Sequence, residues 1–181
     1  DLFTTSNRAQ LLFFTNLGKV HWLKAYEIPQ ATRYSKGKAI INLIKLQQNE
    51  KINAVLPIKE FKENAFILFA TKKGLLKKTP LTEFVNPRQG GIIAISLKEN
   101  DELVDAKLTI GNQEIILATA NGVAVRFNEE DVRPMGRAAS GVRGITLDEN
   151  DWLVGMDYAP ANTTLLTITE NGYGKRTALE E

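Results

Sequence analysis

Two apolar runs flank an Asn-Gly pair in residues 114–127, EIILATANGVAVRF. Short runs rich in Ile, Val and Phe favour β-strands. Asn-Gly is favoured in tight hairpin turns because both residues tolerate positive φ. The stretch therefore predicts an antiparallel hairpin with a two-residue turn at Asn121 and Gly122.

The same arrangement occurs four times along the chain. A four-residue phrase that begins with Thr and ends with Gly follows an apolar run at residues 15–18, 71–74, 119–122 and 169–172. Periods of about 50 residues are typical of propeller blades and solenoids. We predict one repeat domain over residues 1–181, with approximate repeats at 1–49, 50–99, 100–149 and 150–181, the last of them shorter than the others.

The third repeat indicates the internal plan of the unit. Residues 103–108, 114–119 and 123–127 form apolar runs separated by turns, and residues 145–147 supply a fourth short strand. We expect consecutive antiparallel hairpins in four-stranded blades, because strands of about five residues between Gly, Asn and Pro turns are typical of blades. The predicted fold class is all-β, an incomplete ring of blades. Without an initiator methionine, the chain is expected to begin within a longer protein whose further sequence continues the ring.

Composition excludes several function classes. The 181 residues contain no cysteine and one histidine, which excludes disulfides, thiolate metal sites and histidine-dependent relays. No apolar run approaches the roughly 18 residues that a membrane helix needs. The net charge of +2 is too small to identify a nucleic-acid-binding protein by itself.

The distribution of charge is more informative than its sum. Acids gather in the connections between repeats, at residues 99–105 and 148–157, whereas most cations follow the repeated glycine. Lys78, Arg126 and Arg176 each stand four residues past that glycine, and Trp22 takes the place in the first repeat. If each repeat turns alike about an axis, equivalent positions share one rim. A curved basic rim suits duplex DNA, which carries a charge roughly every 1.7 Å.

The candidate phosphate-binding residues follow the repeated glycines, except for Lys72 and Lys73, which directly precede Gly74. The candidates are Lys19, Lys24, Arg33, Lys36, Lys38, Lys72, Lys73, Lys77, Lys78, Arg88, Arg126, Arg133, Arg137, Arg143, Lys175 and Arg176. The alternative is that these side chains are solvated and only protect strand edges. In that case the chain is a propeller-like scaffold for protein partners.

An acid stands nine residues past each repeated glycine, as Glu27, Glu83, Asp131 and Glu181. A carboxylate-dependent hydrolase would require the first three to converge in one cleft. We expect instead that each acid accepts hydrogen bonds from backbone groups at the corner of its blade. The sequence shows no other catalytic constellation.

Several long motifs resemble one family. They are FNEEDVRPMGR at 127–137, GVRGI at 141–145, TENGYGKRT at 169–177, YEIP at 26–29 and KKTPLTEF at 77–84. With these motifs the chain resembles the C-terminal domain of the A subunit of bacterial-type DNA gyrase, nearly end to end. The resemblance implies a β-pinwheel whose blades exchange strands with their neighbours and whose basic outer rim bends duplex DNA.

The resemblance also implies the setting in which the domain acts. The full enzyme introduces negative supercoils with ATP and magnesium, together with the gyrase B subunit, in the cytoplasm beside the nucleoid. The chain itself is expected to hold no cofactor and to catalyse nothing. The family's Gln-Arg-Arg-Gly-Gly-Lys-Gly box is not present, and NPRQGGI at 86–92 resembles it only superficially. The equivalent domain of topoisomerase IV, which relaxes and decatenates DNA, is the alternative within the family.

Overall fold

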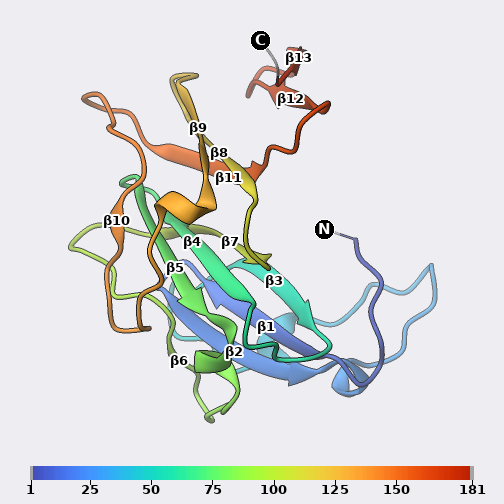
Figure 1. The fold of residues 1–181 in the computed structure, drawn as a ribbon. Coiled ribbons are helices and arrows are strands. Elements are labelled where there is room, and N and C mark those ends of the chain that lie inside the picture. The colour runs from blue at the N-terminus through green and yellow to red at the C-terminus, as the bar shows by residue number, and fades with distance from the viewer. Residues whose placement is uncertain (1, 180–181) are drawn as a thin grey trace.

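A computed structural model describes residues 2–179, and the predicted all-β class is confirmed (Figure 1). Short 3-10 turns join some of the strands: η1 (Ala25–Glu27), η2 (Ile40–Asn42), η3 (Leu81–Phe84) and η4 (Glu129–Asp131). The strands are β1 (Gln10–Thr15), β2 (Lys19–Lys24), β3 (Ile52–Ile58), β4 (Phe66–Thr71), β5 (Leu75–Pro80), β6 (Ile92–Ile93), β7 (Leu103–Thr109), β8 (Glu114–Thr119), β9 (Ala124–Asn128), β10 (Val142–Arg143), β11 (Leu153–Tyr158), β12 (Thr164–Ile168) and β13 (Gly174–Ala178).

The strands within residues 2–179 form four sheets. Their orders are β3-β1-β2-β6 in the first, β10-β5-β4-β7 in the second, β11-β8-β9 in the third and β12-β13 in the fourth. Each of the first three sheets contains a hairpin from one sequence repeat, and the remaining strand or strands come from the next repeat. The resemblance had implied this exchange of strands between neighbours.

The prediction of consecutive hairpins was wrong for the first two strands of a repeat, as the third repeat illustrates. β7 pairs with β4 of the second sheet, whereas β8 begins the third sheet. The connection between them holds two successive left-handed residues, Gly111 and Asn112, with φ values of 99° and 58°. This backbone turns the chain out of one sheet and into the next.

The fourth strand of the unit also lies elsewhere than predicted. The short exchanged strands β6 and β10 begin three residues before the predicted segment 145–147 and its counterpart 95–97 in the second repeat. Their pairing partners are β2 and β5, so β6 and β10 form the outer edges of the first two sheets. The corresponding residues of the first repeat contribute to η2 instead of a strand.

The repeated glycine has a tertiary role as well as a turn role. Gly18 and Gly74 have φ values of 72° and 77°, in the left-handed region that favours glycine. A Cβ on Gly18 would lie 2.6 Å from the Ile95 carbonyl oxygen, and one on Gly74 would lie 2.8 Å from that of Ile145. The segment after each exchanged strand therefore closes over the hairpin tip of the preceding unit.

The hairpin tip differs in detail from the two-residue turn that Asn-Gly predicts. Gly122 has a φ of 87°, but Asn121 is not left-handed. The Gly122 amide donates to the Thr119 carbonyl, and the Thr119 amide donates to the Val123 carbonyl. One left-handed residue closes the tip where the expectation was two.

The cores lie between successive sheets. Phe14 of the first sheet packs edge-on against Phe69 of the second, with ring centroids 5.3 Å apart, and Phe84 completes the cluster. A second cluster around Leu76 and Leu117 joins the second and third sheets. β3, β7 and β11 contact one another in order, so they form the inner side of the stack. None of the helical turns between residues 2 and 179 has the length and apolar character needed to cross a bilayer.

Candidate nucleic-acid interface

Three predicted cations meet at the outer edge of the first two sheets. Lys19 begins β2, Arg88 lies in the loop before β6, and Arg137 lies in the loop before β10. Together with β6 they line a shallow hollow of about 460 Å³. The exchange of strands brings these three side chains together, although they span more than 100 residues of sequence.

Two further hollows continue from the first. Arg88 and Gly91 also line a hollow of about 190 Å³, to which Lys45 contributes. Leu43 connects that hollow to a third, of about 410 Å³, which contains Lys36 and Lys38. Because neighbouring hollows share lining residues, they form one continuous surface, named here the rim tract. Its cations are Lys19, Lys36, Lys38, Lys45, Arg88 and Arg137.

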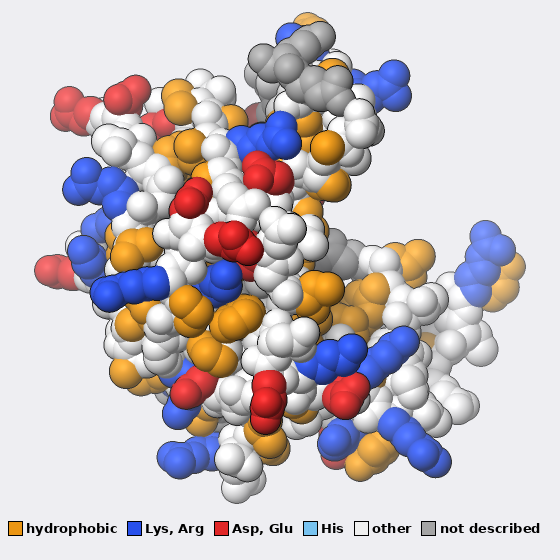
Figure 2. All heavy atoms as spheres, in the orientation of Figure 1, with side chains coloured by type: hydrophobic (Ala, Val, Ile, Leu, Met, Phe, Trp, Pro, Cys, Tyr) orange, Lys and Arg blue, Asp and Glu red, His pale blue; other side chains and the backbone are white. Residues whose placement is uncertain are grey.

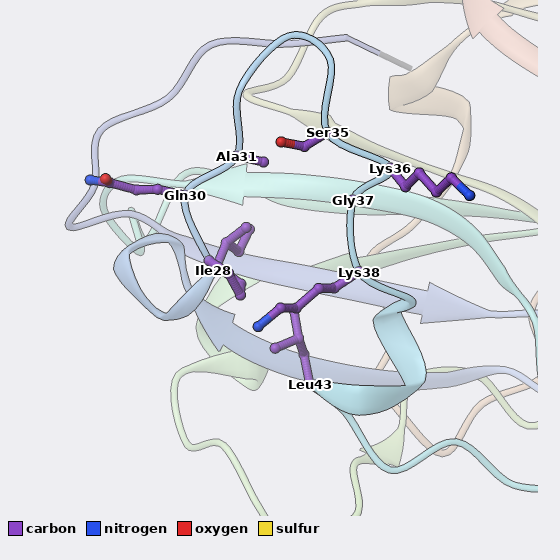
Figure 3. Close-up of a pocket in the computed structure, with 9 residues that line it drawn as sticks. Ile28, Gln30, Ala31, Ser35, Lys36, Gly37, Lys38 and Leu43 are labelled. Atoms are coloured by element: carbon purple, nitrogen blue, oxygen red, sulfur yellow. The ribbon is translucent and has the colours of Figure 1, made fainter.

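The third hollow has an apolar floor with basic edges. Figure 3 shows the Lys38 side chain reaching between Ile28 and Leu43, whereas Lys36 points away from them. The aliphatic stem of a lysine can cover apolar surface while its ammonium stays in water. The stem of Lys38 therefore lies beside apolar side chains, and its charge is free to meet an anion.

The rim tract is electrostatically one-sided. No Asp or Glu lines any of its three hollows. Within residues 2–179, Arg137 is the one tract cation that has a carboxylate within 4.0 Å, at 3.5 Å between its Nε and Glu83 Oε2. The other five cations keep their charge available to phosphate groups.

Two predicted phosphate-binding residues are buried, and the structure contradicts their assignment. Lys77 and Lys78 of β5 are 0% and 5% exposed. The Lys77 ammonium donates to backbone carbonyls, and the Lys78 ammonium lies 3.4 Å from Glu129 Oε2. Both faces of the second sheet are covered by neighbouring sheets and loops, so two successive side chains are buried on opposite faces.

Three of the four residues that stand four past the glycine make a contact between units, whereas Arg176 is exposed on β13. Trp22 Nε1 donates to the Phe84 carbonyl at 3.0 Å, Lys78 Nζ to the Glu129 carbonyl at 3.2 Å, and Arg126 Nη1 to the Leu179 carbonyl at 2.7 Å. Each acceptor lies in the corner that follows the hairpin of the next unit. Trp, Lys and Arg can all make this contact because each has a long side chain with an N–H donor.

Lys72 and Lys73 lie at a hairpin tip, away from the rim tract. They line a hollow of about 340 Å³ with Glu102, Asp151 and Trp152, and it shares no lining residue with the tract. Lys73 Nζ donates to the Glu99 carbonyl at 2.7 Å. The nearby acids make this hollow a weaker site for phosphate.

The remaining predicted cations are dispersed. Lys24 ends β2, Arg33 lies in the exposed loop before η2, Arg133 follows η4, Arg143 is on β10, and Lys175 and Arg176 are on β13. On the face shown in Figure 2, acidic side chains lie among the basic ones near β9 and η4. Glu130 and Asp131 are exposed there. The predicted cations do not form a single wall, and the rim tract contains five of them.

The three described acids of the hydrolase alternative lie in separate corners. Glu27 is in η1, Glu83 in η3 and Asp131 in η4. Glu27 Oε2 accepts the Lys24 amide at 2.7 Å, which is the backbone role that was predicted, whereas Glu83 pairs with Arg137. Among residues 2–179 no group of three His, Cys, Asp or Glu side chains could hold a metal ion. Glu181 lies outside the described residues.

Sequence reasoning missed Lys45. Residues 41–43 are the counterpart of residues 95–97 and 145–147 in the later repeats. Lys45 stands two residues past them, where the other repeats have Glu99 and Glu149. The signal that could have identified Lys45 was a basic residue at a position that is acidic in the other repeats. The structure places Lys45 in the hollow that joins the two larger ones.

The chain matches a known family over nearly all of its length. The family model of the DNA gyrase C-terminal domain, a β-propeller, matches residues 9–59, 65–110, 113–159 and 163–181. The A subunit of DNA gyrase from Clostridium acetobutylicum is 51% identical over 144 residues, which are 80% of this chain and 17% of that relative. The chain therefore spans only a small part of the length of this relative.

Two solved structures have the same fold. The C-terminal domain of DNA topoisomerase IV superposes with a TM-score of 0.88 at 33% identity, over 96% of this chain and 55% of that one. A DNA gyrase A C-terminal domain superposes with a TM-score of 0.79 at 31% identity, over 95% of this chain and 55% of that one. The resemblance seen in the motifs is confirmed, and the chain belongs to the family of DNA gyrase C-terminal β-propeller domains.

Proposed function

We propose that this chain binds duplex DNA along the rim tract and bends it without reading its sequence. The observation that carries the proposal is a continuous outer surface with six cations and no lining carboxylate. Lys and Arg side chains on such a surface bind phosphates of any sequence and release counterions. The gyrase and topoisomerase IV relatives support duplex DNA as the polyanion.

Phosphate contacts along a rim can offset the cost of bending. Smooth bending of a 20 to 30 base-pair site by 40° to 90° costs on the order of 1 to 6 kcal/mol. The tract crosses from the first sheet to loops of the second and third repeats, so its contacts are distributed along a path rather than at a point. Arg143 on β10 and Arg33 beside Lys36 extend this path in our proposal.

The wider role follows the relatives. We propose that the domain wraps DNA with one handedness and so directs ATP- and magnesium-dependent negative supercoiling by the A and B subunits of gyrase in the bacterial cytoplasm, beside the nucleoid. In this proposal, catalysis and cofactor binding belong to other parts of the enzyme.

Charge removal on the tract tests DNA binding. We expect the triple variant Lys19→Gln, Lys45→Gln, Arg88→Gln to bind a mixed-sequence duplex several-fold more weakly, with a salt slope lowered by about one for each lost phosphate contact. Fluorescence anisotropy at several salt concentrations measures both quantities. Lys51→Gln, Lys59→Gln, Lys62→Gln is the matched control, because it removes the same charge from exposed positions outside the tract. Equal affinities and slopes for the two variants would remove the rim tract from the DNA path.

Topoisomerase IV remains a second candidate, because its C-terminal domain gives the higher TM-score. Ligating nicked circular DNA in the presence of the chain separates bending from wrapping. A shift in the linking-number distribution supports the wrapping role that gyrase requires. Binding with no shift favours the topoisomerase IV role, and no binding at any salt concentration favours a protein-interaction scaffold.

A further inference from the structure

Lys77 is a buried cation that the proposed DNA contacts do not use. Its Nζ donates to the Arg137 carbonyl at 2.6 Å, the Ala94 carbonyl at 2.7 Å and the Ala139 carbonyl at 3.2 Å. The three donors of an ammonium match these three acceptors. The side chain also crosses the Phe69 ring, with Nζ 5.7 Å from the centroid. Lys77 thus connects β5 to the two segments that cross between sheets.

The acceptors belong to the rim tract or adjoin it. Arg137 and Ala139 lie in the loop of residues 133–141, which carries the Arg137 guanidinium to the hollow of about 460 Å³. Ala94 directly follows β6, whose residues line the same hollow. A single buried ammonium therefore holds both backbone segments beside this hollow.

The first unit places a different side chain under the equivalent loop. His21 stands three residues past Gly18, as Lys77 stands three past Gly74, and it is 4% exposed. A Cβ on Gly91, just before β6, would lie 2.8 Å from the His21 ring, so the loop lies against this residue. His21 bonds to Glu50 rather than to loop carbonyls. In both units the residue at this position lies against the loop that precedes an exchanged strand. Only in the second unit is it a lysine that donates to carbonyls of that loop.

We propose that Lys77 is a positioning residue for DNA binding: its protonated ammonium fixes the 133–141 loop and so holds Arg137 in the rim tract. This inference rests on the proposed function of that tract. The side chain itself contacts no phosphate, because it is fully buried.

The charge of Lys77 titrates near the physiological range. Burial and the nearby Arg137 guanidinium lower the pKa of the Lys77 ammonium, and the Glu83 carboxylate raises it; together they leave this pKa at about 8. These are the charged groups that face Nζ. Below pH 8 the ammonium is charged and holds the loop, and above pH 8 it loses that charge.

The free energy of unfolding should change with pH in the opposite direction to the DNA affinity. The unfolded chain keeps the Lys77 proton up to about pH 10.5, so it binds more protons than the folded chain between pH 8 and 10.5. The contribution of this group to the free energy of unfolding therefore rises over that range. A loss of DNA affinity at pH 9 cannot then be assigned to Lys77-linked unfolding.

The experiment compares wild-type chain with Lys77→Met in duplex anisotropy and hydrogen exchange. We expect Lys77→Met to bind three- to tenfold more weakly at pH 7 and to exchange faster at amides of residues 133–141, with other strands unchanged. Wild-type affinity should fall with a midpoint near pH 8, whereas the affinity of Lys77→Met should be flat. Lys77→Arg keeps its charge at pH 9 and should restore affinity there.

The outcomes separate the two proposals. Lys77→Met with wild-type affinity, pH profile and loop exchange overturns the positioning role, while the triple rim variant still tests DNA binding. Faster loop exchange without DNA binding by the wild-type chain would support the loop contact and overturn the proposed function. If Lys77→Met does not fold, the wild-type pH profile decides, and an affinity that is constant from pH 7 to 9 overturns the role.

Discussion

Single buried polar residues join neighbouring sheets in this protein. Glu129 is fully buried, and its Oε1 accepts from Thr109 Oγ1 at 2.5 Å and from the Gln113 amide at 2.9 Å. Lys78 supplies the opposite charge from the second sheet. A buried carboxylate is tolerated only when it is hydrogen-bonded and paired. The pair therefore restricts how the second and third sheets can pack.

Removing the cation of this pair should destabilise the protein by the cost of burying an unpaired carboxylate. We expect Lys78→Met to lower the free energy of unfolding by about 3 kcal/mol, because it leaves Glu129 buried without its cation. Lys78→Met with Glu129→Gln should recover part of that loss. Urea denaturation measures both, with Lys72→Met as an exposed control from the same hairpin. A loss below about 1 kcal/mol for Lys78→Met would show that the pair is not needed for packing.

At the scale of elements, each hairpin depends on a segment from the next repeat. The Gly18 carbonyl accepts from the Ala94 and Ile95 amides, and the Gly74 carbonyl accepts from the Gly144 and Ile145 amides. Gly122 has the same turn conformation but nothing within 4 Å of a Cβ position. The three hairpins therefore have the same left-handed glycine in their turns, but within residues 2–179 an exchanged segment contacts this glycine only in the first two.

Two glycine substitutions should distinguish the cost of losing the left-handed turn from the cost of a clash with the exchanged segment. Gly122→Ala should cost about 1 kcal/mol, because it places a side chain in the left-handed region. Gly74→Ala should cost about 2 kcal/mol more, because its Cβ also meets Ile145. Chemical denaturation of the two variants gives the difference. Equal costs would mean that the exchanged segment moves aside without penalty.

The whole molecule is a stack whose burial is uneven. Strands β1, β4 and β8 lie inside their sheets, and the stack buries most of their residues. β12 and β13 form a two-stranded sheet in which most residues are exposed, and Figure 1 shows it projecting from the stack. An isolated two-stranded hairpin is marginally stable in water.

Hydrogen exchange should follow this gradient. Amides of β12 and β13 should exchange through local opening that costs close to zero, whereas amides of β1, β4 and β8 should approach the global free energy of unfolding. Exchange measured by mass spectrometry on the chain without DNA checks this. Protection of β13 equal to that of β4 would contradict it.

Local chemistry made part of this structure predictable. The hairpins around residues 15–18, 71–74 and 119–122 follow from adjacent apolar runs and a glycine turn, which depend on neighbours in sequence. The repeat and the family motifs are likewise properties of the chain alone. Lys19, Arg88 and Arg137 could be proposed as phosphate ligands because they follow repeated glycines, but their meeting in one hollow could not.

The all-β class, the repeat and the positions of the hairpin tips follow from the chain alone, since turn chemistry and apolar periodicity are local. Three features depend on how the strands assemble in space: β7 pairs with β4, Lys77 and Lys78 are buried, and Lys45 completes the rim tract. Strand exchange between repeats explains all three features. A sheet assembled from two repeats and covered on both faces buries successive residues of one strand, so alternation along the sequence no longer distinguishes surface from core.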